Sequence, residues 1–261
     1  MHALLCIDIG NTHVVAALLR GDSLLSEVRI PSGPLLDISE YLSSMETLAV
    51  NAGILPADIP GAVISSVVPR LTGPFTQLVR QFIQREPVIV DHTLPLDLTI
   101  RYDDPSEVGA DRICNAVGAL ERFKAPLIVV DMGTATTFDV VSDQREYLGG
   151  VIMPGLETAG RDLFKRAARL PKVRFDFPQK VIGTQTRESL QSGLMWGTVD
   201  QIDGLIQRIC DEWKAPGVTI IATGGLAGII APHSRYIQHV DKALTLFGMK
   251  YIYEQVTGAS L

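Results

Sequence analysis

The sequence lacks several features on which whole classes of protein depend. Its three cysteines, Cys6, Cys114 and Cys210, lie far apart and form no C-x-x-C pair, so they provide neither a disulfide framework nor a zinc knuckle. No segment approaches the roughly 18 uninterrupted apolar residues that a membrane helix needs. The formal net charge of -6 argues against nucleic acid as the main partner, because a phosphate backbone usually meets a basic face. We expect neither a membrane nor a nucleic-acid partner.

The first residues do not predict a signal peptide, because no basic leader is present and Asp8 interrupts the first apolar run. We therefore expect a soluble cytoplasmic protein. The chain has 261 residues, of which 46% are hydrophobic and 20% charged, and this composition suits one large or two modest globular domains.

Common phosphate-binding and metal-binding patterns are also missing. The chain has no G-x-x-x-x-G-K-[ST] segment, so it has no P-loop. No G-x-G-x-x-G follows the first apolar run, and no pair of histidines stands at helical spacing for zinc.

What the chain does contain, twice, is an apolar run that ends in an Asp-x-Gly turn with a threonine and leads into a second apolar run. The first turn holds Asp8 and Thr12, and the second holds Asp131 and Thr134. Each copy predicts two strands joined by a hairpin, and Gly133 lets the backbone pass close to a ligand. We interpret the copies as two related half-domains facing one cleft, each offering a phosphate-holding turn.

The chemistry of phosphoryl transfer fits this interpretation, because it needs positioning and charge neutralisation more than covalent chemistry. Backbone amides of both turns, with the hydroxyls of Thr12 and Thr134, are suitable donors to phosphate oxygens. Asp8 and Asp131 suit a cation that bridges to phosphate. A single Asp-x-Gly turn is as often a plain hairpin, but a second copy at the equivalent place favours the nucleotide site.

Three other stretches leave alternatives open. In Val108–Arg112, near the start of a predicted helix, Asp111 offers a carboxylate to an incoming hydroxyl and Arg112 offers a planar fork to an anionic group. The same two residues also suit a plain surface pair at a helix start. The glycines of residues 223–228 either approach a nucleoside or form a simple turn. Thr186 is either a ligand contact or a helix cap.

Periodicity predicts the secondary structure of both halves. In the first half we expect strands at 3–9, 14–19, 24–30, 62–68 and 87–91, helices at 38–52 and 71–84, and an exposed loop at 92–106. A helix at 107–123 then precedes strands at 127–130, 148–153 and 218–222 and helices at 156–168, 186–213 and 244–256, and a further strand leaves the Gly133 turn towards Val141. The apolar side of the helix at 186–213 comprises Leu190, Leu194, Ile202, Leu205, Ile206 and Ile209. We place two domains at 1–115 and 116–261.

Five segments, in this order and spacing, resemble the type III pantothenate kinases of the acetate and sugar kinase/Hsc70/actin superfamily. They are DIGNTH, YDDPSEVGADR, DMGTATTFDVV, GGVIMPGL and TGGLA. The resemblance covers nearly the whole chain. It implies an α/β fold of duplicated ribonuclease H-like (actin-like ATPase) domains, each a mixed five-stranded sheet with helices on both faces.

The resemblance also implies an activity, namely ATP-dependent phosphorylation of pantothenate to 4'-phosphopantothenate, the first step towards coenzyme A. Asp111 matches the proton acceptor of the family. The ATP-binding positions match Asp8, Ile9, Gly10, Asn11, Thr12, His13, Val14, Val15 and Thr134. The pantothenate-binding positions match Tyr102, Gly109, Ala110, Asp111, Arg112 and Thr186.

By the same resemblance, Asp131 matches the ligand of a monovalent cation, potassium or ammonium, which the family needs alongside magnesium. The family is homodimeric, with its site at the subunit boundary, and the long helix from Thr186 suits that interface. One departure is Ala159, where the family pattern leads us to expect serine. Two alternatives remain: a non-catalytic regulator that binds nucleotide, and a kinase of the same superfamily acting on another small molecule.

Overall fold

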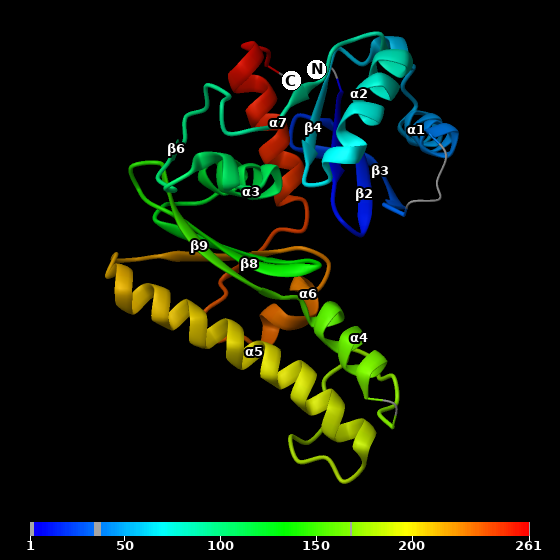
Figure 1. Cartoon of the computed structure of the whole chain (residues 1–261). Helices are drawn as coiled ribbons and strands as arrows, with labels where there is room; N and C mark the ends of the chain where they lie inside the picture. The colour runs from blue at the N-terminus through cyan, green and yellow to red at the C-terminus, as the bar shows by residue number, and fades with distance from the viewer. Residues whose placement is uncertain (1–2, 34–37, 168, 261) are drawn as a thin grey trace. The chain divides into compact units, whose positions relative to one another are not determined.

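The computed structural model describes residues 3–33, 38–167 and 169–260 (Figure 1). The chain divides into two compact units. Unit 1 comprises Met1–Arg122, Arg145–Leu148 and Ala243–Leu261, and unit 2 comprises Phe123–Gln144 and Gly149–Lys242. The C-terminal helix therefore belongs to the same compact unit as the N-terminal strands. A duplication boundary between residues 115 and 116 stays a prediction about the two related halves.

Unit 1 is built on a five-stranded mixed sheet of order β3-β2-β1-β4-β5. Its strands are β1 (Leu4–Ile9), β2 (His13–Arg20), β3 (Ser23–Pro31), β4 (Ala62–Ser66) and β5 (Val88–Ile89). The first three form an antiparallel meander, whereas β4 runs parallel to β1 and β5 parallel to β4. All five strands lie where the alternation of apolar residues predicts them.

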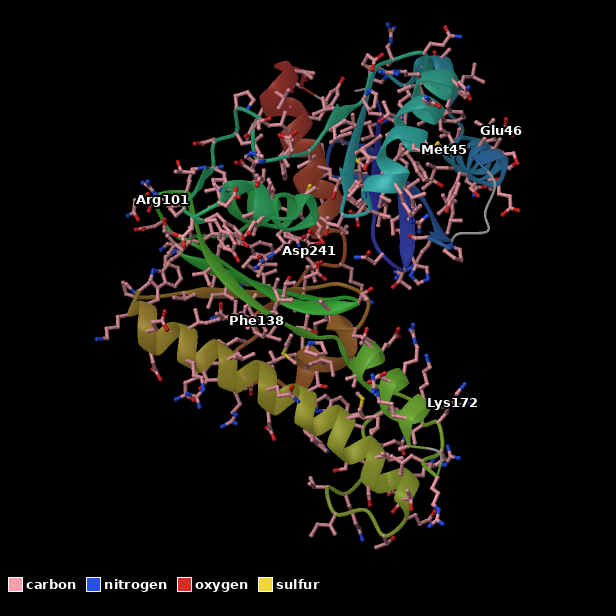
Figure 2. All side chains as sticks on the ribbon, in the orientation of Figure 1. Met45, Glu46, Arg101, Phe138, Lys172 and Asp241 are labelled. Carbon is pink, nitrogen blue, oxygen red and sulfur yellow. The ribbon has the colours of Figure 1, made fainter. Side chains whose placement is uncertain are left out.

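Helices cover both faces of this sheet. On one face lie α1 (Ile38–Ala52) and α2 (Pro69–Ile83), whose apolar residues pack with the odd-numbered residues of β1. Met45 of α1 belongs to this core, whereas the next residue, Glu46, is exposed; both are labelled in Figure 2. The even-numbered residues of β1 face the other way, where the Cys6 thiol lies 3.8 Å from the carbonyl oxygen of Leu246.

That second face is covered by α3 (Ala110–Arg122) and α7 (Leu244–Thr257), which lie side by side in Figure 1. Two glycines allow this close approach. A Cβ on Gly248 would lie 1.8 Å from the carbonyl oxygen of Cys114, and one on Gly118 would lie 2.6 Å from that of Leu244. The backbones of the two helices are thus in direct contact on this face of the sheet.

The second sheet has six strands rather than the expected five, in the order β11-β10-β7-β8-β9-β6. Its strands are β6 (Thr99–Ile100), β7 (Leu127–Met132), β8 (Ala135–Val141), β9 (Glu146–Pro154), β10 (Thr219–Thr223) and β11 (His239–Val240). The two strands of this sheet that were not predicted are β11 and β6, and β6 is a two-residue strand inside the expected loop at 92–106 that pairs in parallel with Glu146 and Tyr147. Otherwise the predicted fold class is confirmed.

The helices of unit 2 are α4 (Leu156–Arg166), α5 (Thr186–Trp213) and the short α6 (Ala227–Ile230). Phe138 of β8, labelled in Figure 2, is fully buried in this unit. Helix α4 ends at Arg166, and residue 168, the expected helix end, lies outside the described residues. Single 3-10 turns occur at Pro56–Asp58, Pro105–Glu107 and Ala231–His233.

Helix α5 has the predicted bounds, but its buried side differs from the prediction. Of the six apolar residues expected there, only Ile202 and Ile206 are fully buried, with Met195 and Val199 beside them. The other four are partly exposed: Leu190, Leu194, Leu205 and Ile209. None of the helices in the described part of the chain is long and apolar enough to cross a membrane.

Candidate active site

The turn between β1 and β2 is held in shape by hydrogen bonds from a neighbouring segment. The amide of Gly10 donates to the carbonyl oxygen of His13 at 3.0 Å. Ser32 donates twice, from its hydroxyl to Gly10 O at 2.6 Å and from its amide to Thr12 O at 2.9 Å. Asn11, at the tip, is exposed. The carbonyl oxygens of Gly10 and Thr12 thus accept hydrogen bonds from Ser32, while the tip of the turn is exposed to solvent.

The expected ATP-binding segment, residues 8–15, alternates between buried and accessible side chains. Ile9 and Val14 are fully buried in the core, so only their backbone atoms are available to a ligand. Asp8, Thr12 and His13 are half-exposed. Contacts from this segment can therefore come from backbone atoms and from the accessible side chains, which also include the exposed Asn11 and the half-buried Val15.

Asp8 stands at the end of β1 opposite Ser65 of β4. The Ser65 hydroxyl, which is fully buried, donates to Asp8 Oδ1 at 2.9 Å. Because a buried hydroxyl has few alternative partners, this hydrogen bond fixes the direction of the carboxylate. Ser65 was not singled out from the sequence.

Asp111 lies in the first turn of α3. Its Oδ1 accepts a hydrogen bond from the amide of Arg112 at 2.8 Å. Burial raises the pKa of the Asp111 carboxyl, and the Arg112 amide and guanidinium oppose the rise only in part. A Cβ on Gly109 would lie 2.6 Å from Asp111 Oδ1, so glycine at that position leaves room for the carboxylate.

Within unit 1, the buried thiol of Cys114 is close enough to Asp8 and Asp111 for both carboxylates to affect its pKa. Burial raises the pKa of the Cys114 thiol well above its usual value, and the negative charges of Asp8 and then Asp111 raise it further. Ser65, which hydrogen-bonds Asp8, also hydrogen-bonds this thiol. The structure therefore brings the first predicted phosphate turn and the predicted proton acceptor to one place, around the same buried residues.

Tyr102 and Arg112 both approach the ring of Tyr147 at the start of β9. The Tyr102 and Tyr147 ring centroids are 6.0 Å apart, and Arg112 Cζ lies 5.7 Å from the Tyr147 centroid. Tyr147 is fully buried, and Arg112 is only 6% exposed. A buried guanidinium over an aromatic face is held by cation–π attraction as well as by packing. Tyr147 was missed because it resembles any inward residue of an alternating strand.

The loop that carries Tyr102 is fastened to β9 by its neighbour Arg101, labelled in Figure 2. The Arg101 amide donates to Tyr147 O at 2.9 Å, and its guanidinium pairs with Glu146. Arg145, the residue before β9, forms ion pairs with Asp97 and Glu121. These bonds explain why a segment expected to be a loop contains the short strand β6.

In unit 2, Asp131 stands near the end of β7 between Thr137 of β8 and Thr223 of β10. Two glycines surround its carboxylate. A Cβ on Gly224, whose φ is +88°, would lie 2.5 Å from Asp131 Oδ1, and one on Gly133 would lie 3.7 Å from it. Gly224 belongs to the glycine stretch for which the sequence allows a nucleoside contact or a simple turn, and its backbone packs against the Asp131 carboxylate.

Thr134 is exposed at the tip of the β7–β8 hairpin. Its carbonyl oxygen accepts hydrogen bonds from Gly155 N at 3.2 Å and from the Thr158 hydroxyl at 2.6 Å. Ala159, the departure from the family pattern, is exposed on α4 immediately after Thr158. The hydroxyl that braces this hairpin therefore comes from Thr158.

Thr186 is the first residue of α5 and is exposed. The N-cap is Gln185, so the sequence alternative that Thr186 caps the helix is wrong. Thr184 instead braces this end, donating from its amide and hydroxyl to Glu188 Oε2 at 3.0 and 3.2 Å. The side chain of Thr186 is accessible to a ligand or to a partner.

The predicted site residues thus fall into two groups. Unit 1 holds the proton acceptor, the first turn and all pantothenate positions other than Thr186, and unit 2 holds Asp131, Thr134 and Thr186. The surroundings of the two Asp-x-Gly turns match strand for strand. Each aspartate lies on a strand with one antiparallel neighbour and one parallel neighbour, and the parallel partner is Ser65 for Asp8 and Thr223 for Asp131.

Comparisons with known proteins identify the family of this chain. The family model described as type III pantothenate kinase matches residues 4–208. A type III pantothenate kinase of Thermomicrobium roseum is 44% identical to this chain over 255 residues, which cover 97% of each protein.

Two solved structures share the fold. A ROK hexokinase from Thermus thermophilus aligns with a TM-score of 0.55 and 13% identity, covering 98% of this chain and 100% of that one. MreB 5 of Spiroplasma citri, solved bound to AMPPNP, aligns with a TM-score of 0.58 and 9% identity, covering 99% and 98%. At such identities the likeness concerns the fold alone, and it confirms the expected actin-like architecture.

Proposed function

The chain belongs to the type III pantothenate kinase family, and from this premise we propose that it transfers the γ-phosphoryl group of ATP to the 4'-hydroxyl of pantothenate. The products are 4'-phosphopantothenate and ADP, and the reaction is the first step of coenzyme A biosynthesis. The observation that carries the proposal is the placement of Asp111, a carboxyl with a raised pKa whose charge acts on the buried Cys114 thiol, the hydrogen-bond partner of the Ser65 that orients Asp8.

In the proposed reaction Asp111 accepts the proton of the pantothenate hydroxyl. The hydroxyl oxygen forms a bond to the γ-phosphorus, the bond from that phosphorus to the β,γ-bridging oxygen breaks, and ADP leaves with the electron pair. A carboxylate of raised pKa is a better base than an ordinary aspartate, because proton affinity rises with pKa. The rest of the catalysis is positioning and charge stabilisation.

For ATP, we propose contacts from the segment Asp8–Val15 and from Thr134. Within the first segment the burial of Ile9 and Val14 restricts their part to backbone atoms. Turn amides are suited to phosphate oxygens, because several N–H groups converge without carrying the counter-charge of a side chain.

For pantothenate, we propose that Arg112 binds the carboxylate of the substrate, with Tyr102 and the backbone of Gly109 and Ala110 beside it. The guanidinium of Arg112 is held over Tyr147 and is nearly buried. A planar donor fork kept in a protected position suits bidentate recognition of a carboxylate.

The residues also fit the cations that the family implies. The described residues form no group of three or more His, Cys, Asp or Glu that could hold a metal ion, so a cation would also need ligands of other kinds. Single carboxylates beside hydroxyls, as at Asp131, suit hard cations that share their ligands with phosphate oxygens. We propose that Asp131 holds a potassium or ammonium ion and that magnesium accompanies ATP. Such cations, when bound, neutralise charge on the phosphates.

We further propose a homodimer. Four apolar residues of α5 remain partly exposed: Leu190, Leu194, Leu205 and Ile209. Val181 and Ile182, just before α5, are 64% and 83% exposed. Apolar surface left open along one helix favours a partner, and the accessible Thr186 at its start would then contact pantothenate of the other subunit.

Turnover of purified protein tests the proposal. We expect 4'-phosphopantothenate to form from pantothenate and ATP in the presence of magnesium and potassium. Asp111→Asn should lower kcat by roughly 10²-fold or more if Asp111 is the base, whereas Asp143→Asn, at an exposed position of a hairpin, should leave kcat unchanged. Phosphorylation only of another small molecule would favour the second kinase alternative, and nucleotide binding without any turnover would favour a regulator.

A further inference from the structure

Three oxygen-bearing side chains form a row across the second sheet. Thr223 of β10, Asp131 of β7 and Thr137 of β8 are register partners on adjacent strands. Register partners project to the same face of a sheet, so the two threonines flank the carboxylate on that face. All three belong to unit 2.

The Thr223 hydroxyl is an exception among buried polar groups. Thr223 is only 1% exposed, and among the described residues its Oγ1 has no hydrogen-bond partner. Burying a hydroxyl without a partner is unfavourable, and such groups in native proteins often mark a bound ion or water. The oxygen therefore lies next to Asp131 with its bonding capacity unused by the protein.

The equivalent row in unit 1 differs in two ways. There the hydroxyl of Ser65 donates a hydrogen bond to Asp8 Oδ1 at 2.9 Å, so the protein itself provides a partner for this hydroxyl. The position that corresponds to Thr137 is Val15, which brings no oxygen. The two copies thus share their backbone pattern but not their chemistry, and of the two parallel-strand hydroxyls, that of Thr223 alone has no hydrogen-bond partner among the described residues.

The backbone next to Thr223 leaves space for this arrangement. Gly224 adopts a φ of +88°, and a Cβ there would lie 2.5 Å from Asp131 Oδ1 and 2.8 Å from backbone atoms of Met132. A side chain at this position would fill the space against the carboxylate, which the glycine keeps open.

We propose that the Thr223 hydroxyl oxygen is a ligand of the monovalent cation, together with Asp131. The inference rests on the proposed function, because that function supplies the cation. Neutral hydroxyl oxygens with a single carboxylate match the low charge of potassium. The same reasoning assigns the cation to the second copy of the duplicated turn, since in the first copy Ser65 is engaged with Asp8.

The test is the dependence of Tm on potassium, measured in potassium chloride with tetramethylammonium chloride keeping the ionic strength constant. A ligand that binds only the folded protein raises Tm with its concentration. We expect the Tm of the wild type to rise, and we expect Thr223→Val to shift the half-saturating potassium concentration upward by roughly tenfold or more, as loss of a group that supports a metal site commonly does.

Three further results separate a cation ligand from a structural role. Thr223→Ser, which keeps the hydroxyl, should restore the potassium response. Thr219→Val removes a hydroxyl from the same strand and face, one that donates to Lys124 O at 2.7 Å, so it should lower Tm without changing the potassium midpoint. In the absence of potassium, Thr223→Val should be at least as stable as the wild type, because it removes a buried hydroxyl that has no protein partner.

The outcomes distinguish this inference from the proposed function. If Thr223→Val has the same half-saturating potassium concentration as the wild type, Thr223 is not a ligand. If the Tm of the wild type does not change with potassium, the cation site itself is wrong. In either case the formation of 4'-phosphopantothenate, measured separately, decides whether the proposed kinase activity stands.

Discussion

Substitution of Gly109 by alanine tests whether the position of the Asp111 carboxylate matters separately from the fold. A Cβ at residue 109 would lie 2.6 Å from Asp111 Oδ1 and 3.4 Å from Val67 Cγ1. To restore an ordinary contact of 3.4 Å, the carboxylate oxygen has to move by about 0.8 Å. The atom that must move is at the end of a side chain, so the backbone can keep its position.

The expected effect is therefore large on catalysis and small on stability. A misplacement near 1 Å costs about 10²-fold in rate, and we expect kcat for phosphorylation of pantothenate to fall by about that factor. Alanine in place of a glycine of ordinary φ changes stability by less than about 1 kcal/mol, so Tm should stay within about 4 °C of the wild type. The assay is steady-state phosphate transfer at saturating pantothenate, with Tm measured on the same preparation.

Gly248→Ala provides the contrasting control. Its Cβ would lie 1.8 Å from the carbonyl oxygen of Cys114, which is backbone, so α3 and α7 have to separate. Overpacking of this kind costs about 3 kcal/mol, and Tm should fall by about 6 °C or more. Wild-type kcat in Gly109→Ala would refute the reasoning about Asp111, and so would a fall in Tm as large as that of Gly248→Ala.

Three further predictions follow from charge and burial. Burial raises the pKa of Asp111, and a base works only when deprotonated, so kcat/KM should fall as pH decreases through a value above that of an ordinary aspartate; an acid limb at or below the usual range, or an unchanged limb in Asp111→Asn, would contradict this. Burial raises the thiol pKa of all three cysteines, but Cys6 and Cys114 are buried and Cys210 is partly exposed, so in native protein Cys210 should react with a thiol reagent and the other two should not, whereas denaturant should expose all three. Tyr147→Leu should raise KM for pantothenate between about twofold and thirtyfold, by removing the ring that supports the predicted carboxylate-binding arginine; an unchanged KM would exclude that support.

Much of the fold was predictable because the apolar periods are strong. The helices at 38–52 and 186–213 have the predicted bounds, and the two meanders follow from alternation and turn residues. The two-residue strands β6 and β11 were not predicted, whereas the equally short β5 was, because β5 lies in the apolar run Val88–Val90 between turn residues. Strand β6 pairs with the distant Glu146 and Tyr147, and the ion pairs of Arg101 with Glu146 and of Arg145 with Asp97 lie beside this pairing; no local pattern indicates such long-range contacts.

The site was predictable where a motif occupies one stretch of chain. Asp8 and Asp111 came from separate motifs, and the structure adds the buried residues that connect them, Ser65 and Cys114. A serine and a cysteine in apolar runs look like ordinary small core residues. Thr223 was likewise interpreted as part of a glycine turn, because its significance lies in its register with Asp131 on another strand.

Whether Asp111 accepts the proton of the pantothenate hydroxyl can be decided from a structure of the protein with pantothenate and a non-hydrolysable ATP analogue. We expect a carboxylate oxygen of Asp111 to lie within about 2.6–3.2 Å of the 4'-hydroxyl of pantothenate, with that hydroxyl facing the γ-phosphate. Pantothenate bound elsewhere, or bound with Asp111 directed away from its hydroxyl, would contradict this expectation.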